Sequence, residues 1–480
     1  MFEPQERARV FATPLGVDLP RALVDGLVKR LAGQAPESWA RVEIYVSTRR
    51  MQRRIQAILA EGPARLLPRI RTISDLGREV SFSDLPAPVS PLRRRLELTR
   101  LITALLTKQP DLAPRAALFD LADSLAGLMD EMQGEGVGPE RLQKIDVANH
   151  SAYWARSLQF LEIVEHYFGE TRAREPDAEA RQRLVVEHLA KRWKAAPPAH
   201  PVIVAGSTGS RGATALFMQT VAQLPQGAVV LPGFDTDLPM PVWERLRDPI
   251  EGEDHPQFRF ARLLETLKLT PADLPLWAPD LAPHNTARNR LVSLALRPAP
   301  VTDQWLSDGA RISREMLEQA CKDLTLIEAP SPRAEATAIA LRLREAVEDG
   351  QVAALISPDR MLTRQVSAAL ARWDVEADDS AGQPLALSAP GRFLRHVAEL
   401  FSHKLTATAL LVLLKHPLTA SGAARGDHLR FSRDRELEVL RAGLPFPTGD
   451  DLTGWSREKH AGDDERLAWA TWLAGLIAGL

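Results

Sequence analysis

The sequence predicts an α/β protein with two lobes, and three observations support this prediction. Short apolar runs alternate with amphipathic helical patterns, which is typical of parallel sheets covered by helices. The length of 480 residues exceeds that of one ordinary domain. Hydrophobic residues make up 45% of the chain and charged residues 25%, as in folded globular proteins.

The first lobe is expected to consist of residues 1–90 and 195–276. Helical spacing of leucines, including a run at 158–164, predicts that residues 91–194 form a helical insertion. A proline-containing linker at 85–88 would lead into this insertion. The lobe itself should contain short buried strands, which we expect at residues 8–12, 42–47, 201–205 and 228–232.

The second lobe is expected to begin after a proline-rich linker at 277–323. It should span residues 324–392, with strands at 324–329 and 353–357 and helices at 333–347 and 361–372. Residues 393–480 have a helical pattern and are expected to form an incomplete helical subdomain. Because the last apolar run has no stop signal, we expect the chain to be the front part of a longer protein.

Charge and cysteine content exclude several classes of protein. A net charge of −2 gives no overall attraction to polyanions, so any DNA site must be a local patch. The single cysteine, Cys321, excludes an internal disulfide and is expected to be a buried thiol. The N-terminus lacks a signal-peptide pattern, and no apolar run approaches the ~20 residues that span a bilayer. We therefore expect a cytoplasmic protein without membrane contact.

Two stretches have the strand–loop–helix pattern of a nucleotide site. Their loops are Thr13–Asp18 and Gly206–Gly212. A working phosphate loop has the pattern G-x-x-x-x-G-K-[ST], in which the lysine contacts phosphate and the hydroxyl holds magnesium. No lysine of this chain follows a glycine. The sequence therefore predicts no ATP hydrolysis at either loop.

Five longer segments resemble the AddB family, particularly its α-proteobacterial branch. AddB is the non-motor partner in the AddAB helicase–nuclease, which processes double-strand DNA breaks. The resemblance implies two RecA-like lobes of the superfamily-one helicase type with helical insertions, truncated in this chain. The segments that carry it are residues 42–54, 66–71, 202–214, 227–235 and 255–258.

The same resemblance implies the partners and the missing chemistry. It implies single-stranded DNA and broken DNA ends as ligands and the AddA motor subunit as the partner in a heterodimer. An iron–sulfur cluster and magnesium are expected only in the C-terminal half of such proteins, and no cofactor is expected in this chain. Ala205 stands where related members keep a magnesium-binding aspartate, and Arg364 stands where active helicases have a nucleotide-sensing arginine. An exposed or ion-paired structural role is the alternative for Arg364.

A nuclease site is not expected in these residues. Nucleases of this superfamily need a Pro-Asp strand end followed by Asp/Glu-x-Lys, in which two carboxylates hold the metal. No lysine of the chain has an acidic residue two places before it. Whether the chain acts as an enzyme is therefore left open, since no ATPase or nuclease site is recognisable.

An arginine-rich stretch is the strongest candidate for DNA binding. Residues 41–71 contain eight arginines and only two acids, Glu43 and Glu61. On a helix starting near Thr48, Arg50, Arg53 and Arg54 would share one face, and Met51, Ile55, Ile58 and Leu59 would share the opposite one. A solvated helix face is the alternative. The candidate contacts to phosphate are Arg49, Arg50, Arg53, Arg54, Arg69 and Arg71.

The second loop is a weaker candidate for an anion site. Backbone amides of Gly206, Ser207, Thr208, Gly209, Ser210 and Arg211 could surround a phosphate at the start of the next helix. Ser210 could instead cap that helix itself. Two other functions stay open: an enzyme that uses this loop as an atypical phosphate loop, and a protein-interaction scaffold without DNA contact. His255 and Phe258 are expected to pack in the core.

Overall fold

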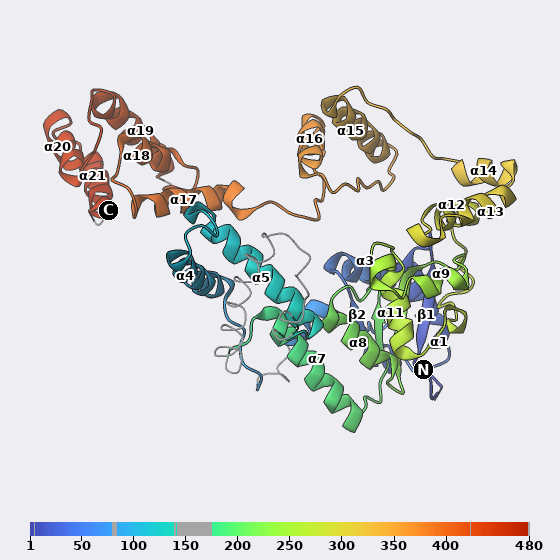
Figure 1. Ribbon diagram of the computed structural model, residues 1–480. Coiled ribbons are helices and arrows are strands. Elements are labelled where there is room, and N and C mark those ends of the chain that lie inside the picture. The colour runs from blue at the N-terminus through green and yellow to red at the C-terminus, as the bar shows by residue number, and fades with distance from the viewer. Residues whose placement is uncertain (4, 79–83, 139–140, 142–174, 423, 479–480) are drawn as a thin grey trace. The chain divides into compact units, whose positions relative to one another are not determined.

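The computed structural model describes residues 1–3, 5–78, 84–138, 141, 175–422 and 424–478. These residues form two compact units, Met1–Leu324 and Thr325–Leu480, and each is described by itself (Figure 1). No helix of the described residues is both long and apolar enough to cross a bilayer.

A five-stranded parallel sheet forms the centre of the first unit. Its strand order is β1-β5-β4-β2-β3. Because all neighbouring strands are parallel, their carboxyl ends meet at one edge of the sheet, called the carboxyl edge below. The strands are β1 (Val10–Pro14), β2 (Glu43–Val46), β3 (Arg69–Thr72), β4 (Val202–Ala205) and β5 (Gly227–Phe234).

Helices cover both faces of this sheet. On one face, α1 (Leu19–Arg30) and α3 (Arg49–Glu61) share an apolar core with Ile44 and Val46 of β2. On the other face, Tyr45 of β2 packs in a second core. The helices of that core are α7 (Ala178–Ala195), α8 (Gly212–Ala222), α9 (Met240–Arg245) and α11 (Phe258–Leu267). The first unit therefore has three layers, and the predicted α/β class with a parallel sheet is confirmed for this unit.

The expected helical insertion divides into two parts. Helices α4 (Pro91–Lys108) and α5 (Leu118–Glu135) pack on each other around a core of their own. Helix α7 instead covers the sheet, because Val185, Val186 and Leu189 are buried in the sheet's core. The run at 158–164 lies outside the described residues. The other short helices of the unit are α2 (Glu37–Arg41), α10 (Pro249–Gly252), α12 (Thr286–Ala295), α13 (Gln304–Ser307) and α14 (Arg314–Cys321).

The linker expected at 277–323 belongs to the first unit instead. Leu276 forms a parallel bridge with Ala12 of β1. Trp277 is fully buried, and its indole Nε1 donates to the Leu23 carbonyl at 3.2 Å. A Cβ added at Gly26 would lie 2.2 Å from that Nε1, so only glycine leaves room for the ring. Burial of this large aromatic surface attaches the stretch to the sheet.

The second unit is helical in its described residues, and the two strands predicted there are wrong. Segments 324–329 and 353–357 carry no strand, and the side chains of Leu326 and Ile356 are 84% and 94% exposed. Strands need backbone partners, and no neighbouring strand supplies them here. The helices are α15 (Pro332–Glu348), α16 (Arg360–Leu370), α17 (Ala389–Leu400), α18 (Ala407–Lys415), α19 (Arg425–Arg435), α20 (Gly449–Lys459) and α21 (Asp464–Ile477), with a π-helical turn at Glu436–Leu440.

Candidate nucleic-acid interface

Helix α3 begins directly after β2, and its two faces are those that the sequence predicts. Thr48 is the N-cap residue, and its hydroxyl accepts a hydrogen bond from the Met51 amide at 3.2 Å. Ile55, Ile58 and Leu59 are buried against the sheet. The opposite face, which carries the arginines, is therefore turned to solvent.

Helix α3 also begins at the carboxyl edge. At its start, the Arg49 guanidinium lies 3.9 Å from the Asp75 carboxylate, just beyond β3. One and a half turns later, the Arg54 guanidinium lies 3.8 Å from the Asp18 carboxylate, just beyond β1. The first turns of the helix therefore lie at the edge at which open α/β sheets bind their ligands, and the rest of the helix packs on one face of the sheet.

Four exposed arginines on this helix form what we call the arginine ridge: Arg49, Arg50, Arg53 and Arg54. The ion pairs of Arg49 and Arg54 are long and their side chains are more than half exposed, so these pairs stabilise little. Arg53 lies between them and makes no ion pair with any residue that the structure describes. The ridge therefore offers cationic groups that a polyanion can reach.

Arg69 and Arg71 do not join the arginine ridge. Arg69 stands beside Glu43 at the amino end of its strand, and the two form an ion pair at 3.4 Å. Arg71 stands beside Tyr45, whose ring packs against that of Phe217 of α8, with the two ring centres 5.1 Å apart. Side chains at aligned positions share a face of the sheet, so Arg71 points to the face opposite α3. The structure thus separates these two candidates from the other four.

The loop after β1 leaves no open phosphate site at the start of α1. The Asp18 carboxylate caps the helix by accepting from the Arg21 amide at 3.3 Å. The Asn289 side chain donates to the Leu15 carbonyl at 2.8 Å, and Asn289 belongs to α12. A phosphate at this helix terminus would meet the capping carboxylate instead of free amides.

The crevice above β4 is filled by side chains from α1 and α3. Gly206 adopts the left-handed conformation with φ +75°. A Cβ added there would lie 2.6 Å from the Met51 Sδ and 3.1 Å from a methyl group of Leu19. Open α/β sheets bind their ligands in the crevice outside the carboxyl ends of the strands. Met51 and Leu19 take that space in this chain.

The start of α8 differs from the expected anion site. Arg211, not Ser210, is its N-cap residue, and no side chain caps the helix. The Arg211 guanidinium instead forms an ion pair with Glu179 at 2.9 Å. A cavity of about 670 Å³ opens here, and among the described residues its lining has five acids and two arginines. The charged lining residues are Asp130, Glu131, Glu135, Glu179, Glu253, Arg211 and Arg259.

This acidic lining makes the loop a poor site for phosphate. A Cβ added at Gly212, the first residue of α8, would lie 2.9 Å from a carboxylate oxygen of Glu135 and 2.3 Å from the Gly134 carbonyl oxygen. Negative groups therefore already face the positive end of α8. The assignment of Gly206, Ser207, Thr208 and Gly209 as an anion loop stays a prediction that this geometry does not favour.

A buried polar network closes the carboxyl end of β5, and sequence reasoning missed most of it. The Gln257 side chain accepts from the Asp235 amide at 3.1 Å and donates to the Gly233 carbonyl at 3.0 Å. Burial lowers the pKa of His255, and the nearby Arg297 lowers it further. The sequence signal that could have indicated this network is the polar Asp235, which directly follows an apolar strand. As predicted, Phe258 packs in the core, whereas His255 is half-buried.

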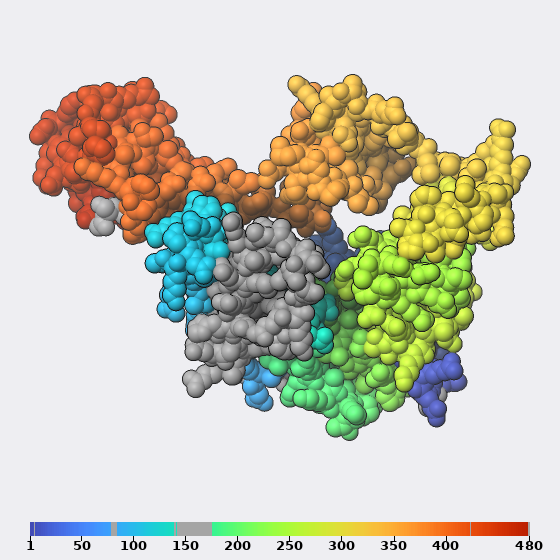
Figure 2. Space-filling model, in the orientation of Figure 1, coloured from blue at the N-terminus to red at the C-terminus, as the bar shows by residue number. Residues whose placement is uncertain are grey.

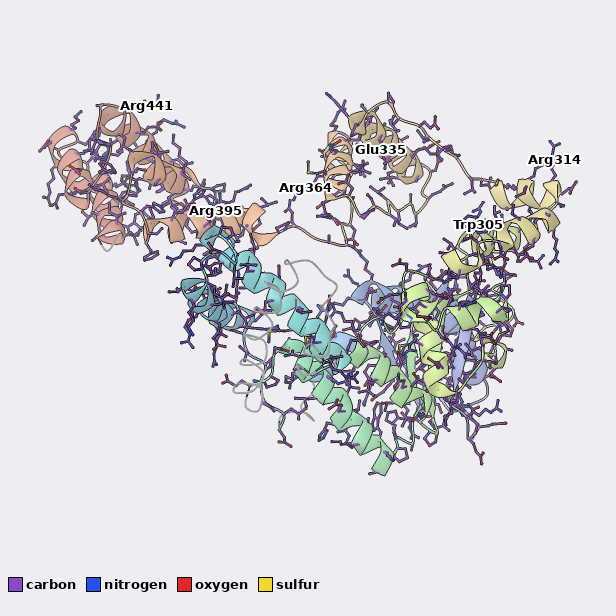
Figure 3. The ribbon with its side chains drawn as sticks, in the orientation of Figure 1. Trp305, Arg314, Glu335, Arg364, Arg395 and Arg441 are labelled. Atoms are coloured by element: carbon purple, nitrogen blue, oxygen red, sulfur yellow. The ribbon has the colours of Figure 1, made fainter. Side chains whose placement is uncertain are left out.

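Two further single-residue predictions have different outcomes. Arg364 lies on α16 and is exposed (Figure 3), which agrees with the structural alternative but does not test a sensing role. Cys321 is exposed at the end of α14, so the prediction of a buried thiol is wrong. Its short helix has only Ala320 buried and therefore gives the thiol no core to enter.

No family model matches the chain, and no curated protein is significantly similar to it. The function is therefore argued from the geometry described above.

Proposed function

We propose that this chain is the DNA-binding, ATPase-inactive helicase-like portion of an AddB-type subunit. It would bind single-stranded DNA and broken DNA ends beside an AddA-type motor subunit during double-strand break repair. The observation that carries the proposal is the arginine ridge on α3, which follows β2 and begins at the carboxyl edge. The sheet order and the family resemblance support the helicase-like part.

Phosphate binding by the arginine ridge follows from its exposure and charge. Guanidinium groups form strong bidentate hydrogen bonds with phosphate oxygens. The acids Asp18 and Asp75 pair with the arginines at the two ends of the ridge, and both carboxylates also accept other hydrogen bonds. Arg50 and Arg53, in the middle, are the residues that we expect to contribute most to affinity.

The inactive nucleotide site is supported by three features of the carboxyl edge. Asp18 caps the helix start that a phosphate would need, and Met51 fills the crevice above Gly206. Helix α12 donates a side-chain hydrogen bond to the loop after β1. Because no lysine is available to contact the phosphates, ATP would gain little binding free energy from this site. The proposed role of the lobe is therefore to hold DNA while the partner supplies the motor activity.

Binding of a fluorescent oligo(dT) to the purified chain, measured by anisotropy, tests the proposal. Arg50→Glu combined with Arg53→Glu should weaken binding roughly a hundredfold at low salt and reduce the slope of log K against log salt by about 1.4. Arg211→Glu is the matched control, because that arginine starts α8 but lies in the acidic cavity. Its effect should stay within about twofold.

Two results would contradict the proposal. Equal affinities of the α3 double variant and the parent chain at every salt concentration would favour a scaffold without DNA contact. Steady turnover of magnesium–ATP that disappears with Gly209→Ala or Arg211→Ala would favour an atypical phosphate loop. Circular dichroism of each variant checks that the fold is retained.

A further inference from the structure

We propose that the second unit carries a separate contact surface for unpaired bases of single-stranded nucleic acid. It lies at the corner where α17 ends and α18 begins, and we call it the α17 corner. The choice of ligand rests on the proposed function, whereas the surface itself is independent of the arginine ridge. Its residues are Arg395, Phe401, His403, Lys404 and Phe446.

The α17 corner lies in a strongly basic stretch of a chain that is acidic overall. Between residues 389 and 426 the sequence has five lysines or arginines and one acid, a net charge of +4, compared with −2 for the whole chain. The single acid, Glu399, is shared by Arg395 at 3.8 Å and His396 at 3.3 Å. Of the five cations, Lys415 forms an ion pair with Glu436, whereas Lys404 makes no ion pair with any described residue. The α17 corner therefore keeps an unpaired lysine beside the weakly paired Arg395.

Two exposed phenyl rings accompany these charges. Phe401 is 77% exposed and Phe446 is 44% exposed. The Lys404 ammonium lies 4.2 Å from the centre of the Phe446 ring, which is a cation–π contact. A hydrogen bond of 2.9 Å from the Ala407 amide to the Pro445 carbonyl holds this second ring beside the first turn of α18. A lysine and a ring that touch each other can receive a phosphate and its base together.

The corner is open because α17 buries little of its surface. Only Gly391 and Leu400 of this helix are fully buried. The segment lies on the surface of the second unit, orange in Figure 2, and Arg395 is labelled on α17 in Figure 3. Single exposed apolar residues are ordinary in proteins, but exposed rings beside exposed cations are the composition of surfaces that bind single strands.

The rings favour unpaired bases over other acidic ligands. In a duplex the bases are already stacked on each other, so the two phenyl rings find no free base on which to stack. Only the basic side chains then contribute to binding, through contacts with phosphates. An acidic peptide would gain from Arg395 and Lys404 but would offer no aromatic face to Phe401. We therefore expect the two rings to contribute more to the affinity for single strands than to the affinity for duplex DNA or for polyglutamate.

The experiment compares four forms of the full chain with fluorescent oligo(dT). They are the parent chain, the α3 double variant, Phe401→Ala with Phe446→Ala, and the combination of all four substitutions.

Removing both rings should weaken oligo(dT) binding roughly tenfold and leave the salt slope unchanged. Arg395→Glu with Lys404→Glu should instead lower the slope by about 1.4. Exposed Leu385→Ala and Arg333→Glu, in the same unit, are controls that should leave affinity within about twofold.

Each outcome separates the two proposals. Loss of binding in the α3 variant alone, with the ring variant unchanged, overturns this inference and keeps the proposed function. Loss in the ring variant alone keeps this inference and removes the arginine ridge from the proposed function. Absence of any oligo(dT) binding overturns both. If the rings instead strengthen binding to phosphatidylserine vesicles or to polyglutamate, the surface belongs to a membrane or a protein and the inference fails.

Discussion

Helices α3 and α8 both follow a strand of the same sheet and both begin at its carboxyl edge, yet their surroundings have opposite charge. Helix α3 has a side-chain cap and an exposed row of arginines. Helix α8 has no side-chain cap, and its first residues line a cavity with five acids. Position in the fold therefore does not decide what a helix start can bind. The neighbouring elements decide it.

The largest expected effect tests the contact that joins the two helices. Gly206, the first residue of the loop before α8, is left-handed, and a Cβ added there would lie 2.6 Å from the Met51 Sδ of α3. Gly206→Ala should lower the free energy of unfolding by about 2 kcal/mol, because alanine is strained there and Met51 must move. Gly209→Ala is the matched control with a similar φ and more space, and should cost about 1 kcal/mol. Equal losses in urea denaturation would contradict this packing.

The second prediction compares the caps of the two helices. Thr48→Ala removes the hydrogen bond to the Met51 amide and should lower the free energy of unfolding by about 1 kcal/mol. Ser210→Ala should change it by less than about 0.5 kcal/mol, because Ser210 caps nothing in the described structure. Thermal and urea unfolding of both variants measure the difference. A larger loss for Ser210→Ala would reverse the comparison.

A smaller effect is expected from the acid at one end of the arginine ridge. Asp18→Asn removes a carboxylate that lies 3.8 Å from the Arg54 guanidinium, and asparagine can still cap α1. Oligo(dT) affinity should rise about twofold to threefold at low salt, and the gain should shrink as salt is added. Unchanged or weaker binding would show that Arg54 does not contact the DNA.

The last prediction concerns β5, which lies between β1 and β4 in the sheet. Burial holds the pKa of His255 below its ordinary value of 6.5. As the pH falls below about 6.5, the unfolded chain therefore binds a proton that the folded chain does not, and the free energy of unfolding falls. His255→Asn keeps an acceptor for the Gln257 amide and should make this pH dependence shallower between about pH 7 and 5.5.

The control for this prediction is the parent chain itself. Burial and the neighbouring Asp235 raise the pKa of Asp237, which contributes with the opposite sign as the pH falls. Only the difference between variant and parent therefore reports on His255. Identical slopes of unfolding free energy against pH in the two proteins would contradict the assignment.

Elements with a strong local pattern were predictable from the sequence. Four of the five strands and helix α3, including its start at Thr48, fall where apolar runs and arginine spacing place them. The fifth strand, β3, was missed because Arg69 and Arg71 alternate with apolar and small residues in a run of only four. The segment at 353–357 shows the reverse error, since an apolar run becomes a strand only beside another strand.

The surroundings of the α8 start could not be predicted locally. Its loop has the glycines and hydroxyl groups of a phosphate site, and nothing within it opposes an anion. The acids come from α5 and α7, through Glu135 and Glu179, which lie far away in the sequence. Similarly, no local pattern indicates that Trp277 returns to fill the space above Gly26.

The pairing of β1 with β5 has a consequence for how the chain is made. Val10 is aligned with Val229, so the first strand has no lasting neighbour until nearly half of the chain has left the ribosome. At synthesis rates of about 5–20 residues per second, that wait is roughly 10–40 s. An apolar N-terminal segment that stays unpaired for so long is a natural client for a nascent-chain chaperone.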